Sequence, residues 1–270
     1  MMPTVFQALV LGLLQGLAEF LPISSSAHLT LAPWLFNWPD PGLSFDVALH
    51  FGTLLAVVWY FRAEWVELLR AAWQIVTTRK IDTVEQKRAA FLIVATIPGG
   101  IFGLLLEKKA ESAFRNPAII ACALIVLGIL LWLADKLARR DRPITHMTWL
   151  DAVVIGLAQV FALIPGVSRS GSTITAGRAL GLDRNGAAAF SFLLSMPIIA
   201  AAVVLKGPHL IRESGISMPL LVGVVASAVS GWLAISVLLK YVSRHSYGVF
   251  ALYRVLLGAV VLAVYFSRGG

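Results

Sequence analysis

Long apolar runs separated by short polar loops dominate the chain. Six of them approach the ~20 residues that a helix needs to cross a bilayer, at residues 45–61, 89–106, 117–134, 185–205, 217–239 and 248–266. Strand-like alternation of apolar and polar positions is absent, which favours helices over barrel strands. The pattern predicts an all-α polytopic membrane protein with six transmembrane helices in one membrane domain over residues 1–270.

Two further pairs of apolar segments are too short to cross a membrane. Residues 4–21 and 27–36 flank Pro22, and residues 148–164 and 172–182 flank Pro165. Irregular backbone at membrane depth is tolerated only where protein or a wet cavity surrounds it. Each pair is therefore predicted to form a re-entrant helical hairpin.

The order of one hairpin followed by three spans occurs twice. Gly12-Leu13-Leu14-Gln15 matches Gly156-Leu157-Ala158-Gln159, and Pro22 aligns with Pro165 after a one-residue gap. Three crossings are an odd number, so the second copy enters the membrane from the opposite side. We therefore expect an inverted-topology internal repeat, over about 1–140 and 145–270, with its site where the broken helices meet.

Residues 62–88 are polar and of mixed charge, unlike the runs around them. Trp65, Leu68, Leu69 and Trp73 have the spacing of one apolar helix face. This segment is predicted to lie along the membrane interface.

Composition agrees with a bilayer environment. The chain is 59% hydrophobic and 13% charged, against ~25% charged in soluble proteins. With the predicted spans, 14 of the 22 Lys and Arg residues fall on the side opposite the termini, six fall on the side of the termini, and Arg169 and Arg254 fall within the hairpins and spans. Basic residues concentrate on the cytoplasmic side, so both termini are predicted outside.

Charge and cysteine content exclude some classes of function. The net charge of +8 is a topology signal here, and no motif for nucleic acid is present. Cys122 is the only cysteine, so the chain has no internal disulfide, and a thiolate metal site is not expected.

Glu19 is an ionisable residue in an apolar helix, and Gln15 shares its helix face one turn earlier. Intramembrane acids are functional by default, which makes Glu19 a candidate general base or metal ligand. The oxygens of Gln15 and Glu19 suit a hard divalent cation, Mg²⁺ or Ca²⁺. The alternative is a structural ion pair between Glu19 and an arginine.

Three hydroxyls, Ser24, Ser25 and Ser26, and the imidazole of His28 follow Pro22. One serine is explained as a helix cap, but a half-helix N-terminus is also an anion site, and the two roles share one geometry. His28 is a candidate base, acid or nucleophile.

The second broken segment supplies a cation in place of the acid. Leu163 or Ala162 stands where Glu19 would be, and Arg169 lies between Ser168 and Ser170. The candidate ligands for phosphate oxygens in this segment are Ser168, Arg169, Ser170, Gly171 and Thr173. Pairing of Arg169 with Glu19 is the alternative. Secondary polar residues within the spans, for which structural roles are favoured, are Asp46, His50, Ser191 and Arg254.

These motifs resemble those of the integral-membrane undecaprenyl-pyrophosphate phosphatases of the bacitracin-resistance type. The resemblance runs along essentially the whole chain. It rests on Gln-x-x-x-Glu at 15–19, on the serines up to His28, on Pro-Gly-x-Ser-Arg-Ser-x-x-Thr at 165–173, on Phe190–Leu194 and on Leu252-Tyr253-Arg254.

The resemblance implies hydrolysis of undecaprenyl pyrophosphate to undecaprenyl phosphate and inorganic phosphate with a divalent cation, which recycles the lipid carrier of cell-wall precursors. It implies a multi-pass protein of the bacterial cytoplasmic (inner) membrane whose site opens outward. Expected partners are undecaprenyl pyrophosphate and membrane lipids, with bacitracin competing for the substrate. A homodimer is left open.

The residues leave several questions of mechanism open. The nucleophile is a hydroxyl of Ser24–Ser26 in the favoured interpretation, with His28 and Glu19 moving protons. His28 itself and a metal-bound water are alternatives. A transporter or flippase of a polyprenyl phosphate lipid is the rival function, because broken helices in inverted repeats are common among carriers. A non-catalytic scaffold gives no reason for a buried Glu19, His28 and Arg169.

Overall fold

The computed structural model describes residues 3–112, 116–138 and 142–269, and over these residues it is helical and contains no strand. The α-helices in chain order are α1 (Val5–Phe20), α2 (Ser25–Phe36), α3 (Leu43–Tyr60), α4 (Arg62–Thr78), α5 (Val84–Ser112), α6 (Pro117–Leu137), α7 (Trp149–Val160), α8 (Arg169–Ala179), α9 (Arg184–Ser214), α10 (Met218–Val242) and α11 (Gly248–Ser267). Two 3₁₀ turns, η1 (Ile144–His146) and η2 (Phe161–Leu163), precede and follow α7.

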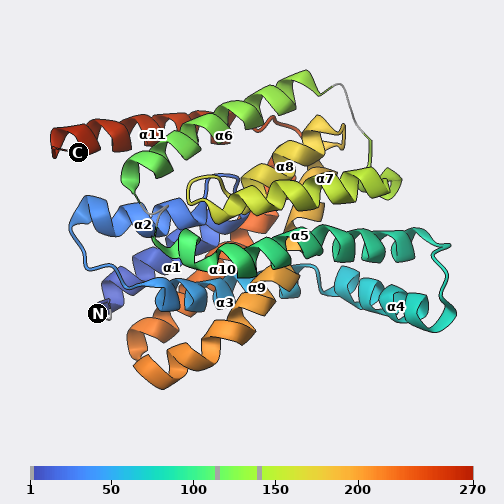
Figure 1. The fold of residues 1–270 in the computed structure, drawn as a ribbon, viewed down its shortest axis with the longest axis horizontal. Helices are drawn as coiled ribbons and strands as arrows, with labels where there is room; N and C mark the ends of the chain where they lie inside the picture. Colours follow the sequence, from blue (N-terminus) through green and yellow to red (C-terminus); the bar gives the residue numbers. More distant parts are fainter. Residues whose placement is uncertain (1–2, 113–115, 139–141, 270) are drawn as a thin grey trace.

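Six helices are long and apolar enough to cross a membrane, as predicted: α3, α6, α10 and α11, residues 84–106 of α5 and residues 184–208 of α9. The remaining apolar helices α1 and α7 are shorter. The all-α polytopic fold class is therefore confirmed. The termini lie at the same end of the bundle (Figure 1).

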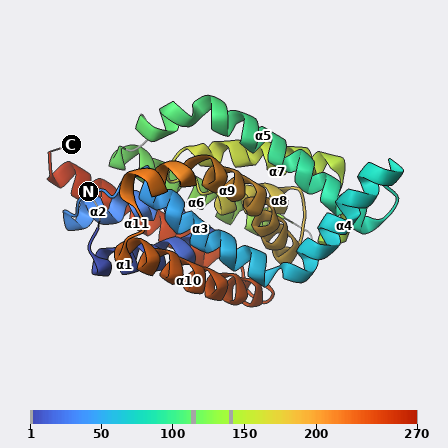
Figure 2. The same ribbon diagram turned by 90° about the horizontal axis from the view of Figure 1, so that it is seen from below.

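Several boundaries differ from the prediction. α5 begins at Val84 rather than at residue 89, so the polar segment 62–88 holds all of α4, which Arg79 ends in a left-handed conformation (φ 55°), and the first residues of α5. α8 begins at Arg169 rather than at residue 172, since Ser168 caps it. The predicted interfacial placement of 62–88 stays a prediction. Figure 2 shows α4 extending beyond the other helices.

The two broken segments have matching local features. Thr4 starts α1 with a capping box, and Thr148, 144 residues later, starts α7 with another. Ser24 and Ser168, also 144 residues apart, cap α2 and α8. Packing follows the same correspondence. In the predicted repeat α7 is the counterpart of α1 and α10 is the counterpart of α5, and α1 packs on α10 just as α7 packs on α5. The counterparts α3 and α9 pack on each other, as do α6 and α11.

Small residues allow α1 and α10 to approach closely. A Cβ atom at Gly12 would lie 2.3 Å from the carbonyl oxygen of Gly223, and a Cβ at Gly16 would lie 2.0 Å from Ser230 Oγ. Lipid gives little hydrophobic drive for helices to associate, so such backbone contacts and interhelical hydrogen bonds hold membrane bundles together. This packing fixes the helix that carries Gln15 and Glu19.

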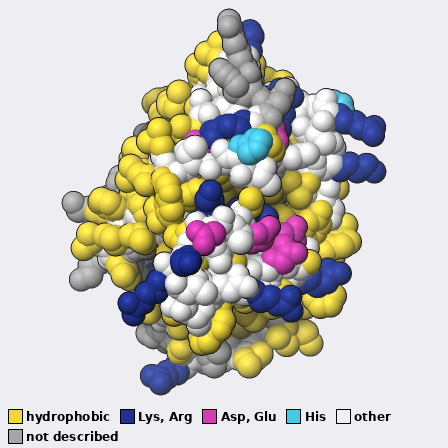
Figure 3. All heavy atoms as spheres, turned by 90° about the vertical axis from the view of Figure 1, so that its right-hand side faces the viewer, with side chains coloured by type: hydrophobic (Ala, Val, Ile, Leu, Met, Phe, Trp, Pro, Cys, Tyr) yellow, Lys and Arg dark blue, Asp and Glu magenta, His cyan; other side chains and the backbone are white. Residues whose placement is uncertain are grey.

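A buried ionic cluster ties four elements together at the end opposite the termini. Asp135 of α6 accepts hydrogen bonds from Arg178 Nε (2.9 Å), Arg184 Nε (2.8 Å) and the backbone N–H of Tyr247 (3.0 Å). Arg142 and Asp151 add a bidentate pair of two 2.8 Å bonds. Figure 3 shows Lys and Arg side chains gathered on this end with apolar side chains around them. The topology count also used Lys108, Lys109, Arg115, Arg139 and Arg140, whose side chains lie outside the described residues.

Candidate active site

Two breaks in the chain bring the N-termini of α2 and α8 to the site. Ser24 Oγ accepts from the N–H of Ala27 (3.3 Å), and Ser168 Oγ accepts from the N–H of Gly171 (3.0 Å). Both serines have positive φ, 76° and 73°. Such backbone costs on the order of 1–3 kcal/mol and concentrates at functional sites. Each half-helix therefore begins with a strained, capped serine.

Glu19 lies at the centre of the polar groups between these helices. The residue is 6% exposed. Its Oε2 accepts from Ser25 Oγ (2.6 Å) and Gln15 Nε2 (3.2 Å), and its Oε1 accepts from Arg169 Nη2 (3.0 Å). The structure thus brings together an acid from the first broken segment and a cation from the second, which is the pairing that the sequence offered as the alternative for both residues.

Arg169 connects three helices. Besides Glu19 on α1, it donates through Nη1 to the carbonyl oxygen of Ser191 on α9 (2.6 Å). These bonds use two of the five guanidinium N–H groups. The other three have no hydrogen-bond partner among the described residues.

His28 occupies the first turn of α2, and its hydrogen bonds fix its tautomer. Nδ1 lies 2.7 Å from the carbonyl oxygen of Ser24 and must donate to it, because a carbonyl only accepts. Nε2 lies 2.7 Å from Tyr253 Oη, and the two rings stack with centroids 5.7 Å apart. In the neutral ring, Nε2 therefore carries the lone pair and accepts from the tyrosine.

The remaining predicted phosphate-binding residues line the start of α8. Ser170 Oγ contacts Ser168 Oγ and donates to the carbonyl oxygen of Leu21 (both 3.2 Å), and Thr173 Oγ1 contacts Ser191 Oγ (2.7 Å). Ser26 Oγ contacts Ser24 Oγ at 3.2 Å, as Ser170 contacts Ser168. These hydroxyls brace the two turns against each other and against α9.

Sequence reasoning underrated three residues that lie at this site. His50 of α3 places its Nε2 atom 3.4 Å from Glu19 Oε2 of α1. Tyr253 contacts His28, and Arg254 bonds to the carbonyl of Pro22. His50 and Arg254 stood out as polar residues within spans, and Tyr253 only as part of a family motif.

The donor set around Gln15 fits a hard cation with substrate oxygens completing its shell. Gln15 Oε1 is buried and has no hydrogen-bond partner among the described residues, although its amide nitrogen bonds to Glu19. A buried amide oxygen without a partner costs free energy, which a cation would offset. No cluster of three or more His, Cys, Asp or Glu side chains suited to a metal occurs in the described part of the chain. A cation here would therefore depend on phosphate oxygens, as Mg²⁺ commonly does.

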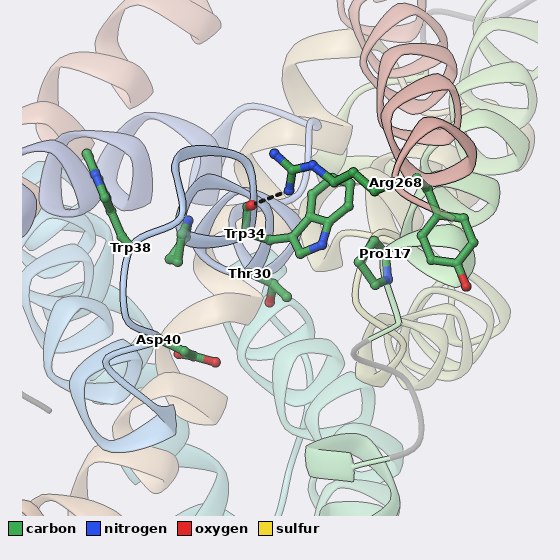
Figure 4. A pocket seen from close by; sticks show the side chains of 8 residues that line it. Thr30, Trp34, Trp38, Asp40, Pro117 and Arg268 are labelled. Carbon is green, nitrogen blue, oxygen red and sulfur yellow. Dashed lines mark hydrogen bonds between the residues drawn. The ribbon is translucent and has the colours of Figure 1, made fainter. Parts of the chain in front are cut away.

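A separate cavity of about 520 Å³ opens near the C-terminal end of α2 (Figure 4). Arg268 lies over the ring of Trp34, 4.8 Å from its centroid, and donates to the carbonyl oxygens of Trp34 and Leu35. None of the predicted site residues lines this cavity, whose lining consists of Thr30, Pro33, Trp34, Trp38, Asp40, Pro117, Tyr265 and Arg268.

The fold and site together define a class: a polytopic helical membrane protein with a carboxylate, hydroxyls, an imidazole and a guanidinium at the tips of two broken helices. The sequence model of the family described as bacitracin resistance protein BacA matches residues 8–260. The chain belongs to that family.

Curated relatives match along nearly their whole length. A protein of Gemmatimonas aurantiaca named undecaprenyl-diphosphatase is 62% identical over 98% of this chain and 99% of its own. Proteins of the same name from Moorella thermoacetica and Pelotomaculum thermopropionicum are 50% and 48% identical, over 98% of this chain and 99% and 98% of theirs.

Proposed function

We propose that this chain hydrolyses undecaprenyl pyrophosphate to undecaprenyl phosphate and inorganic phosphate and so recycles the lipid carrier of cell-wall precursors. The observation that carries the proposal is the Glu19 carboxylate, which holds the Ser25 hydroxyl on one oxygen and the Arg169 guanidinium on the other. The names of the full-length relatives support the same substrate. A lipid diphosphate suits this fold, because its chain stays among apolar helices while its head group enters a polar site.

Ser25 is the nucleophile in this proposal, since its hydroxyl alone among Ser24–Ser26 donates to Glu19. Ser25 Oγ attacks the terminal phosphorus, the Oγ–P bond forms, and the bond from phosphorus to the bridging oxygen breaks. The Oγ proton passes to Glu19, and undecaprenyl phosphate leaves with the bridging oxygen. Phosphoryl transfer depends mainly on alignment and neutralised charge, which the free N–H groups of Arg169 and the starts of α2 and α8 supply.

Water then hydrolyses the phosphoserine. Its oxygen bonds to phosphorus, the Oγ–P bond breaks, and Glu19 returns its proton to Ser25 Oγ. The proton that the water loses passes to Tyr253 Oη as that hydroxyl gives its own proton to His28 Nε2, and from there it leaves to solvent. Inorganic phosphate is the second product.

Gln15 and Glu19 would hold a divalent cation, Mg²⁺ or Ca²⁺. Such an ion would supply further positive charge against the diphosphate oxygens.

We also infer that α1–α2 and α7–α8 are re-entrant hairpins of an inverted repeat. The paired capping boxes, the paired serine caps and the reciprocal packing of α1 on α10 and α7 on α5 support this arrangement. The basic end opposite the termini (Figure 3) supports termini and a site opening on the outer side of the bacterial inner membrane. Competition by bacitracin and a homodimer remain predictions.

The test is phosphate release from undecaprenyl pyrophosphate by the purified chain in detergent. We expect the wild type to release phosphate and Ser25→Ala to release it at least 10³-fold more slowly. Ser236→Ala, which changes an exposed serine of α10, should release phosphate at the wild-type rate. Rapid quenching with substrate labelled in its terminal phosphate is expected to trap phosphoserine at residue 25. Absence of phosphate release, together with lipid translocation in vesicles, would support the transporter instead.

A further inference from the structure

Arg254 of α11 is fully buried, and every hydrogen bond it makes goes to a backbone carbonyl. Its exposure is 0%. Nε donates to Leu124 O (3.2 Å), Nη1 to Pro22 O (3.1 Å), and Nη2 to Gly166 O (2.7 Å) and Val167 O (3.0 Å). Pro22 belongs to the first chain break, and Gly166 and Val167 belong to the second. One guanidinium therefore holds both turns of the site.

No carboxylate pairs with Arg254 among the described residues. A buried charge is costly unless an opposite charge or metal compensates it. Four carbonyl dipoles satisfy most of its N–H groups but carry no net charge. Glu19 and Arg169 compensate each other, whereas the positive charge of Arg254 has no carboxylate in contact with it among the described residues.

The guanidinium group of Arg254 lies next to the first turn of α8. A Cβ atom built on Gly171 would lie 2.5 Å from Arg254 Nη1. Nη1 has one N–H beyond its bond to Pro22. The charge thus lies behind the capped turns that precede Ser24 and Ser168, next to the helix N-termini that favour anions.

We propose that Arg254 is a positioning residue that also supplies the second fixed cation of the diphosphate site. Its fork holds the two turns so that Ser25 and Arg169 face each other across Glu19, and its charge is compensated when the diphosphate binds. The proposal rests on the proposed function for the identity of the anion. It explains why a charged arginine, rather than a neutral side chain, occupies this buried position.

Binding of inorganic pyrophosphate to the purified full-length chain tests the proposal without requiring turnover. The thermal transition is followed by tryptophan fluorescence at fixed Mg²⁺ while pyrophosphate is titrated, because a ligand of the native state raises Tm. We compare wild type, Arg254→Gln, Arg254→Lys and Arg268→Gln. Arg268 is the matched control, since it also lies at α11 and donates to two carbonyls, but at the other end of that helix.

We expect the pyrophosphate concentration for half the Tm rise to increase at least tenfold in R254Q. It should stay within threefold of wild type in R254K, which keeps the charge, and in R268Q. In R254K, kcat for the lipid should nevertheless fall at least tenfold with KM within threefold, because lysine lacks the planar fork.

Three outcomes would overturn the proposal: no Tm rise in the wild type, a folded R254Q with unchanged pyrophosphate dependence, or a folded R254K that binds as weakly as R254Q. If R254Q does not fold, the pyrophosphate dependence of R254K decides, and a tenfold loss there refutes a charge effect. Pyrophosphate binding without lipid hydrolysis would refute the proposed function and leave the role of Arg254 intact.

Discussion

Neutralising one partner of the Glu19–Arg169 pair should destabilise the protein, and neutralising both should restore it. The two groups are 6% and 12% exposed, and their N–O distance is 3.0 Å. Removing one partner of a buried pair typically costs about 3–5 kcal/mol, whereas replacing both by neutral groups is close to neutral. In Arg169→Gln the carboxylate keeps its bonds from Ser25 and Gln15, so we expect a cost near the lower limit, about 3 kcal/mol.

The magnitude is measurable as a shift in Tm. With about 2–4 °C per kcal/mol for a chain of this size, Arg169→Gln should lower Tm by roughly 6–12 °C, and Glu19→Gln by a similar amount. The double variant should lie within about 1 kcal/mol of wild type, while all three lose phosphate release. Thermal scans in one detergent at one pH, with activity assayed on the same samples, provide both readouts.

A double variant at least as unstable as the sum of the single variants would refute this reasoning. The two side chains would then contribute independently, and the site would not be a coupled acid–cation pair. Retained phosphate release in either single variant would remove that residue from the proposed mechanism.

Four further predictions follow from other contacts. His28→Ala should reduce phosphate release at least 10²-fold and cost about 1 kcal/mol or more of stability, because Tyr253 Oη loses its partner, and near-normal turnover would contradict the assigned proton transfer. Gly16→Leu should lower the free energy of unfolding by about 1–3 kcal/mol or more, since a Cβ there overlaps Ser230 Oγ, and a wild-type Tm would show that α1 can move away from α10. Asp135→Ala removes the buried carboxylate that pairs with Arg178 and Arg184 and should cost about 3–5 kcal/mol, measured by thermal scans, whereas phosphate release per folded molecule should change little. A chelator should abolish phosphate release and added Mg²⁺ or Ca²⁺ should restore it, and turnover in the chelator would exclude a required cation.

Hydropathy was sufficient to predict the six spans because each is dominated by apolar residues, with only isolated polar side chains such as Asp46, His50 and Arg254. It was less informative where polar residues continue a helix. The first residues of α5, with Glu85, Lys87 and Arg88, fall in the polar segment 62–88 of the hydropathy pattern but belong to the long helix α5 in the structure. The start of α8 was placed three residues late, since the serine that caps it stands among other small polar residues.

The candidate site was predictable as a set of residues but not as a set of contacts. Charge in an apolar helix marked Glu19 and Arg169, and their pairing could be stated as an alternative. The contact of His50 with Glu19 depends on how α3 is rotated against α1, which a single sequence does not encode locally. Arg254 was expected to need a partner, and its partners are main-chain carbonyls that no side-chain pattern reveals.

The close packing of α1 on α10 has a consequence for the order of assembly. Gly12 emerges from the ribosome more than 200 residues before Gly223, whose carbonyl it contacts. At ~5–20 residues per second, the gap is roughly 10–40 s. During that time the short apolar helix α1 lacks the surface of α10 on which it packs. We therefore expect Glu19 to reach its final position only after the penultimate helix has been inserted, which would make the candidate site one of the last parts of the protein to form.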